Sequence, residues 1–141
     1  MTNFVWLTAE NDLSDIISLR MSVFCDEQGY PRDKELDNLE DSSLHLSLYS
    51  DGLLAGCGRV SHLQDDTFLI GRIALYRQFR GKGLGRVLVC ELISKARELG
   101  AGKIMVNAQV QAMGFYQTLG FVVCGDEFMD ETILHIPMLL E

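Results

Sequence analysis

Glycine recurs at every second position in Arg80-Gly81-Lys82-Gly83-Leu84-Gly85, between two segments of opposite periodicity. The preceding run, residues 68–75, is apolar and predicts a strand. After it, apolar side chains repeat at helical spacing from Leu84 to Leu99 and stop at Gly100, which predicts a long amphipathic helix. Glycine lets the backbone approach a ligand closely, and the first turn of a helix offers unpaired N–H groups and the positive end of a dipole. We therefore expect an anion site at this turn, most plausibly for phosphates.

Two common phosphate-binding loops do not fit this run. A Walker A loop ends in Lys followed by Ser or Thr, whereas Gly85 is followed by Arg86 and Val87. The dinucleotide pattern G-x-G-x-x-G requires glycine at the position of Arg86. A glycine-rich turn with a purely structural role is the alternative to a phosphate site.

The run does resemble the R/Q-x-x-G-x-G/A signature of the GNAT superfamily of N-acetyltransferases, which Arg80, Gly83 and Gly85 match. In that family the loop holds the pyrophosphate of acetyl-CoA. The resemblance therefore implies that acetyl-CoA is bound by Arg80, Gly81, Lys82, Gly83, Leu84, Gly85 and Arg86.

Residues 109–121, QVQAMGFYQTLGF, carry a second part of this resemblance. They are similar to the family's N-x-x-A-x-x-F/L-Y-x-x-L/F-G-F segment. Tyr116 stands at the position of a tyrosine that lies beside the CoA sulfur. Gln109 stands where many relatives have an Asn that hydrogen-bonds the cofactor arm. Because the two segments occur in the family's order and at a similar separation, the resemblance covers most of the chain.

The predicted elements follow an α/β order within one domain, residues 1–141. Strands are expected at 4–7, 44–49, 53–60, 67–75, 103–107, 121–124 and 132–139. Helices are expected from Asp12 or Ser14 to about Gln28, at 84–99 and at 111–119. Residues 32–43 form a polar, acidic stretch. The resemblance implies the GNAT fold. This is a mixed sheet of about seven strands with helices on both faces, in which strands four and five splay into a V.

The resemblance also implies how the cofactor arm is held in that V. The backbone of Ile73 and Leu75, in the fourth strand, would pair with the pantetheine amides, and one of these N–H groups would polarise the thioester carbonyl. Gly71 marks a bulge or bend in the same strand.

The implied reaction is direct attack of an amine on the acetyl thioester, without an acyl-enzyme. An alkylamine of pKa ~10.4 is almost fully protonated at pH 7, and neutralising it costs about 4–5 kcal/mol, so a base is useful. The departing thiolate leaves more easily if it is protonated. Tyr116, with an ordinary tyrosine pKa of ~10, is the candidate general acid. A tyrosine that only packs in the core is the alternative.

His135 is the candidate general base, because its ordinary pKa suits that role at neutral pH. Strand alternation places it on one face with Ile133, and Pro137 indicates an edge strand or a bulge that opens this face to a ligand. A hydrogen-bonded structural histidine is the alternative. His45 and His62 are weaker candidates.

Glu27 is a third candidate. It ends Val23-Phe24-Cys25-Asp26-Glu27-Gln28, and Glu35, Asp37 and Asp41 follow. This resembles the V-F-x-x-E-Q…E-x-D…D pattern of a largely uncharacterised bacterial GNAT branch. The first helical region shapes the acceptor pocket in the superfamily, so the resemblance implies that these carboxylates bind an ammonium group or act as base. A solvated acidic loop is the alternative, and Arg72 suggests instead an acidic group on the acceptor.

Charge and composition narrow the classes of partner that the protein is expected to bind. The net charge of −8 argues against a nucleic-acid surface, which needs a basic face, and suits a cationic amine or peptide, although it serves solubility equally well. No apolar run reaches the ~20 residues of a membrane span, and no signal segment is visible, so we expect a cytoplasmic protein without a membrane partner. The scattered cysteines, without a C-x-x-C pair, predict no metal site.

Two functions fit this sequence. One is an acetyl-CoA-dependent N-acetyltransferase that acts on a primary amine of a small molecule or peptide. The other is a non-catalytic acyl-CoA-binding sensor. The glycine loop supports both, whereas Tyr116 and His135 favour the enzyme. Many members of the superfamily are homodimers, which makes a homodimer a further expectation.

Overall fold

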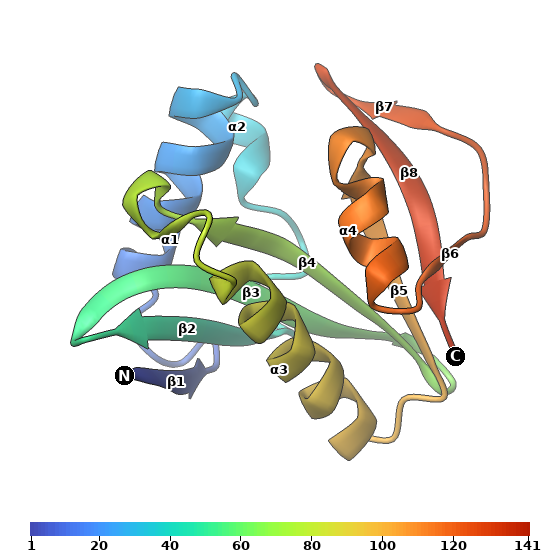
Figure 1. Ribbon diagram of the computed structural model, residues 1–141, viewed down its shortest axis with the longest axis horizontal. Helices are drawn as coiled ribbons and strands as arrows, with labels where there is room; N and C mark the ends of the chain where they lie inside the picture. The colour runs from blue at the N-terminus through green and yellow to red at the C-terminus, as the bar shows by residue number, and fades with distance from the viewer.

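All strands of the chain join a single mixed sheet in the computed structural model, which describes residues 1–141 (Figure 1). The strands are β1 (Thr2–Leu7), β2 (Leu44–Ser50), β3 (Leu53–Gln64), β4 (Thr67–Leu75), β5 (Lys103–Gln109), β6 (Val122–Val123), β7 (Phe128–Asp130) and β8 (Ile133–Leu140). Their order in the eight-stranded sheet is β1-β2-β3-β4-β5-β8-β6, and β7 also pairs with β8. The predicted mixed sheet is confirmed, with one strand more than expected.

Helices cover both faces of this sheet. They are α1 (Ser14–Arg20), α2 (Arg32–Glu35), α3 (Leu84–Glu98) and α4 (Met113–Thr118), with a π-helix at Met21–Glu27 and 3₁₀ turns at Arg77–Phe79 and Val110–Ala112. α3 and α4 pack on one face, around Leu48, Leu88 and Ile104. α1 packs on the other, around Leu19 and Cys57. No helix combines the length and the apolar composition that a membrane span requires.

The β4 and β5 strands separate halfway along their length. They pair in parallel from Thr67 with Lys103 to Ile70 with Val106, and no further. Gly71 of β4 pairs with Arg59 of β3, and Ala74 pairs with Cys57. Three residue steps along β4 therefore lie opposite two along β3, so β4 contains a bulge directly after Gly71. Arg72, within the bulge, has a φ of 50°, which an arginine rarely adopts. The predicted splay and the bend near Gly71 are confirmed.

The first helical segment differs from the prediction in its periodicity. α1 passes without interruption into the π-helix Met21–Glu27, whose wider turns shift the buried side. Up to Val23 the buried residues keep α-helical spacing, whereas beyond it Cys25, five residues after Arg20, is buried and Phe24 is only partly so. A pure 3.6-residue period does not predict that change of face.

The expectation that Pro137 marks an edge strand is wrong. β8 lies inside the sheet, between β5 on one side and β6 and β7 on the other. β6 pairs with β8 only up to Val123 with Met138, and β7 resumes at Phe128 with His135. Pro137 therefore lies opposite the interruption between the two short strands, where its missing N–H interrupts no ladder.

The contact of α3 with β3 predicts a cost for Gly58→Ala. A Cβ at Gly58 would lie 2.6 Å from Cδ1 of Leu92, which is fully buried and has no room to move. We expect a loss of about 1–3 kcal/mol in the free energy of unfolding, measured by urea denaturation. Gly114→Ala is the control, because a Cβ there meets nothing within 4 Å. Equal stability of the two variants would contradict this close packing.

Candidate active site

A cavity of about 250 Å³ lies where β4 and β5 have separated. Its walls on the two strands are formed by residues 71–73 of β4 and 106–109 of β5, and Tyr116 of α4 also lines it. The end of the π-helix covers one side and the β7–β8 hairpin covers the other. Figure 1 shows the elements on these two sides, the α1–α2 segment and the red β7–β8 hairpin.

The glycine loop presents free backbone donors beside this cavity. Gly81 and Gly83 have φ values of 77° and 80°, which favour glycine, and Gly83 is the N-cap of α3. The N–H groups of residues 81–86 donate no hydrogen bond to another part of the chain, and no side chain caps the helix. A run of N–H groups at the start of a helix that extends from Leu84 to Glu98 can hold a phosphate.

The side chains of the loop point in several directions. Leu84 packs in the core, so only its backbone is available to a ligand. Lys82 Nζ lies 5.9 Å above the ring of Phe79, and Arg86 donates to the hydroxyl of Thr118 at 3.4 Å. Both cations stay at the surface beside the free amides.

Arg80 is held by the chain itself. Its guanidinium donates twice to the Leu75 carbonyl, at 3.1 and 2.8 Å, and contacts both carboxylate oxygens of Glu27, at 2.8 and 3.1 Å. The hydrogen bond from Arg80 lowers the pKa of Glu27, and the charges of Arg80 and Arg77 add to this. Glu27, a candidate base, thus points at the glycine loop and does not line the cavity.

Tyr116 lines the cavity with a hydroxyl that has no hydrogen-bond partner in the chain. Its ring is buried between Phe115 and Phe121, with edge-to-face contacts to both. Burial raises the pKa of Tyr116, so the phenol stays protonated at neutral pH. The side chain is therefore both packed in the core and open to the cavity at its polar tip.

His135 lies on another wall of the same cavity. Its Nδ1 is 2.9 Å from the carbonyl oxygen of Ile133, which only accepts, so Nδ1 carries the proton and the neutral ring keeps a lone pair on Nε2. The ring stacks on Phe128 at 5.6 Å between centroids, with an interplanar angle of 20°. His45 and His62 do not line the cavity, and their Nε2 atoms lie beside the carbonyls of Glu40 and Asp65.

Gln109 lines the cavity at the end of β5 and contacts the residue that follows the π-helix. Its Nε2 donates to Oε1 of Gln28 at 2.7 Å, and its Oε1 accepts from Gln111 at 2.6 Å. A hydrogen bond between Gln109 and a cofactor would replace one of these partners. Of the two β4 residues expected to contact the cofactor, Ile73 lines the cavity, whereas the Leu75 carbonyl is bound by Arg80.

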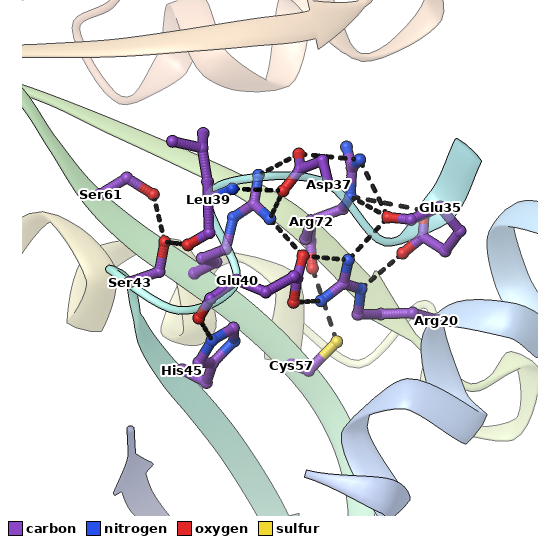
Figure 2. Close-up of polar contacts among 11 residues, drawn as sticks. Arg20, Glu35, Asp37, Leu39, Glu40, Ser43, His45, Cys57, Ser61 and Arg72 are labelled. Atoms are coloured by element: carbon purple, nitrogen blue, oxygen red, sulfur yellow. Dashed lines mark hydrogen bonds and ion pairs between the residues drawn. The ribbon is translucent and has the colours of Figure 1, made fainter. Parts of the chain in front are cut away.

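Of the candidate carboxylates after Glu27, Glu35 and Asp37 are bound by arginines and are not free to bind an ammonium group. Glu35, Asp37 and Glu40 alternate with Arg20, Arg59 and Arg72 in a closed ring of ion pairs (Figure 2). Each charge in this ring contacts two of the opposite sign. Asp41, in contrast, is exposed. We call these six residues the charge ring.

The charge ring is buried at its centre and reaches the cavity at one edge. The side chains of Arg20 and Glu35 are each 1% exposed, and Arg72 donates to the Glu35 carbonyl and to Asp37. Burial alone would raise the pKa of Glu40, but the hydrogen bonds and charges of Arg20 and Arg59 outweigh this and hold that pKa below its usual value. Glu35, Arg59 and Arg72 line the cavity.

Sequence analysis missed several cavity residues, among them Gln28, Tyr30, Phe128 and Asp130. Arg20 and Arg59 gave the one usable signal for the charge ring, since a charged residue in an apolar segment needs a partner when it is buried. Nothing in the local sequence shows that the partners come from α2 and the loop after it.

Comparison with known proteins identifies the family. Residues 13–141 match the Acetyltransferase (GNAT) domain family. The chain belongs to the GNAT acetyltransferases. It is 34% identical to the uncharacterized N-acetyltransferase YjcF of Bacillus subtilis, over 92% of this chain and 93% of that protein.

Solved GNAT structures share the fold over almost the whole chain. An acyl-CoA N-acyltransferase from Pseudomonas aeruginosa is 26% identical, with a TM-score of 0.88 and 99% of both chains covered. A GNAT family acetyltransferase from Elizabethkingia anophelis, with acetyl-CoA bound, is 16% identical, with a TM-score of 0.77 over 99% of this chain and 97% of that one. The GNAT fold expected from the two sequence segments is thereby confirmed.

The glycine loop predicts that Gly83→Val weakens the binding of acetyl-CoA. Valine at a φ of 80° is strained by roughly 1–2 kcal/mol, and the loop relieves this by turning its amides away from their present direction. We expect the Kd for acetyl-CoA to rise about tenfold or more, measured by calorimetry.

Gly100→Val is the matched control for that variant. Gly100 has a φ of 103° at the other end of α3, so valine there introduces similar strain far from the loop. Its Kd should equal that of the unmodified protein. An unchanged Kd for Gly83→Val would mean that the phosphates bind elsewhere.

The charge ring predicts a pH-dependent effect of Glu40→Gln. The ring holds the pKa of Glu40 low, so the carboxylate contributes stability above its unfolded pKa of ~4.3, and this contribution is lost as pH falls through the lower folded pKa. We expect Glu40→Gln to lose about 3 kcal/mol of unfolding free energy at pH 7 and progressively less below about pH 4. Asp26→Asn, which breaks an exposed pair with Arg32, should cost under about 1 kcal/mol. A Glu40→Gln cost that does not change with pH would contradict this account.

Proposed function

We propose that the protein is an acetyl-CoA-dependent N-acetyltransferase that transfers the acetyl group directly to a primary amine of a small molecule or peptide. One observation carries this proposal. The Tyr116 hydroxyl and the His135 ring line the same cavity, which opens where β4 and β5 separate, beside a loop with free N–H groups. Membership of the GNAT family supports the use of an acyl-CoA.

The backbone provides the cofactor side of this site. The amides of residues 81–86 take the pyrophosphate, and the unpaired edge of β4 beyond Ile70 takes the pantetheine arm. The N–H of Ile73 polarises the thioester carbonyl. Glu27 acts on this side as a positioning residue, because its carboxylate holds Arg80 against the end of β4.

Two side chains move the protons. Nε2 of neutral His135 removes a proton from the acceptor ammonium, and the free amine attacks the carbonyl carbon. As the C–S bond breaks, the Tyr116 hydroxyl donates its proton to the departing sulfur of CoA. Solvent then takes the proton from His135 and the second proton that the nitrogen loses as it becomes an amide, and it returns one proton to Tyr116, so the products are an acetamide and CoA thiol, with one proton released.

The first experiment measures thiol release from acetyl-CoA with a panel of polyamines, amino acids, aminosugars, arylamines and lysine peptides. Tyr116→Phe should lower kcat by about 10²-fold and leave the Kd for acetyl-CoA unchanged. His135→Gln should lower kcat/KM, because the variant has no group to take the proton from the acceptor ammonium.

The same panel separates the enzyme from a sensor. Tight binding of acetyl-CoA without thiol release from any amine would favour a non-catalytic acyl-CoA-binding protein. Turnover that Tyr116→Phe leaves unchanged at all pH values would show that another group protonates the thiolate.

A further inference from the structure

The outer end of the cavity carries a carboxylate that no cation of the chain neutralises. Asp130, at the end of β7, lines the cavity, and Oδ1 accepts a hydrogen bond from the Tyr30 hydroxyl at 3.0 Å. Neither oxygen forms an ion pair. The pKa of Tyr30 is raised to about 12, mainly by burial and to a lesser extent by the hydrogen bond to Asp130. The phenol therefore remains a neutral partner.

The other charges on the cavity wall are already matched. Glu35, Arg59 and Arg72 belong to the charge ring, in which every guanidinium contacts two carboxylates and every carboxylate contacts two guanidinium groups. His135 is neutral when it acts as base. The excess charge facing the cavity is therefore negative, and it belongs to Asp130.

The hairpin register gives the distance from this charge to the reacting end. Phe128 pairs with His135, and Asp130 pairs with Ile133, so the four side chains form two rows on the cavity face. Two residues along a strand correspond to about 7 Å. Asp130 thus lies about 7 Å farther out than the row that contains His135.

We infer that Asp130 binds a second positive charge on the acceptor, so that the preferred substrates are amines with another cationic group about 7 Å from the reacting nitrogen. This inference rests on the proposed function and names its substrate class. A chain of roughly four to six methylene groups spans that distance. It would run past Phe128, in the row of His135, to Ile133, in the row of Asp130.

The contacts around Asp130 suit an ammonium group. The carboxylate has one oxygen without a partner and keeps the phenol of Tyr30 on the other. Phe128 and Tyr30 bring aromatic rings to the cavity wall, and ring faces attract cations. An acceptor with a terminal carboxylate would meet the unpaired charge of Asp130, while Arg72 is already bound by Glu35 and Asp37.

The test compares three acceptors with the same number of carbon atoms: 1,5-diaminopentane, pentylamine and 5-aminopentanoate. They differ only in a terminal group that is positive, neutral or negative. We expect kcat/KM to be about tenfold higher for the diamine than for pentylamine, mainly through KM, and lowest for the amino acid. Asp130→Asn should reduce the preference for the diamine to within about twofold.

Two control variants isolate the charge of Asp130. Asp130→Glu keeps the carboxylate and should retain the preference for the diamine. Glu127→Gln removes an exposed carboxylate outside the cavity, before the start of β7, and should also retain it. Equal kcat/KM for diamine and pentylamine, or a preference that survives Asp130→Asn, would overturn the inference.

Direct binding separates this inference from the proposed reaction. If no amine releases thiol, calorimetry with the CoA-loaded protein still tests the site, using 1,5-diaminopentane and pentylamine as probes. Binding of the diamine that is lost in Asp130→Asn would support the site, although the transfer reaction had failed. Absence of diamine binding in the unmodified protein would overturn the site as well.

Discussion

The charge ring ties α1, α2 and the loop after α2 to the sheet through ion pairs rather than through strand pairing. Its members come from α1, from α2 and the loop that follows, from β3, and from the bulge of β4 (Figure 2). Buried charges are costly unless they are paired, and each charge here has two opposite neighbours. Arg72 belongs both to the ring and to the bulge. The ring therefore fixes α1, α2 and the loop after α2 relative to the point where β4 leaves β5.

In the proposed reaction, that separation divides the site into a cofactor side and an acceptor side, with two kinds of recognition. On the cofactor side the donors are backbone N–H groups of the glycine loop, which depend on conformation rather than on side-chain identity. On the acceptor side the cavity wall consists of side chains such as His135 and Asp130. Tyr116 lies between the two sides. A conserved reaction with a variable acceptor is compatible with this arrangement, because acceptor side chains can change without disturbing the loop.

The predictions succeeded where the cause is local. Glycines before an apolar helical repeat specify a left-handed turn and a helix start, and both are present at Gly83. Alternation along the last strand correctly placed His135 with Ile133 on a shared face, which turned out to face the cavity. The edge-strand prediction at Pro137 failed, because a proline is tolerated there opposite a gap between β6 and β7 that lies elsewhere in the sequence. The π-helix was missed because one wider turn leaves no clear residue signature.

Sequence reasoning thus reached the family, the phosphate loop, and Tyr116 and His135 as candidates, because these depend on residue type and short-range spacing. It did not reach the closure of the charge ring, the binding of Glu27 to Arg80, or the position of Asp130 opposite the π-helix end. Such contacts join residues up to 100 positions apart. A charge carries no mark of its partner in the chain, so the folded sheet, by setting which segments meet, decides whether a carboxylate is neutralised or left facing the cavity.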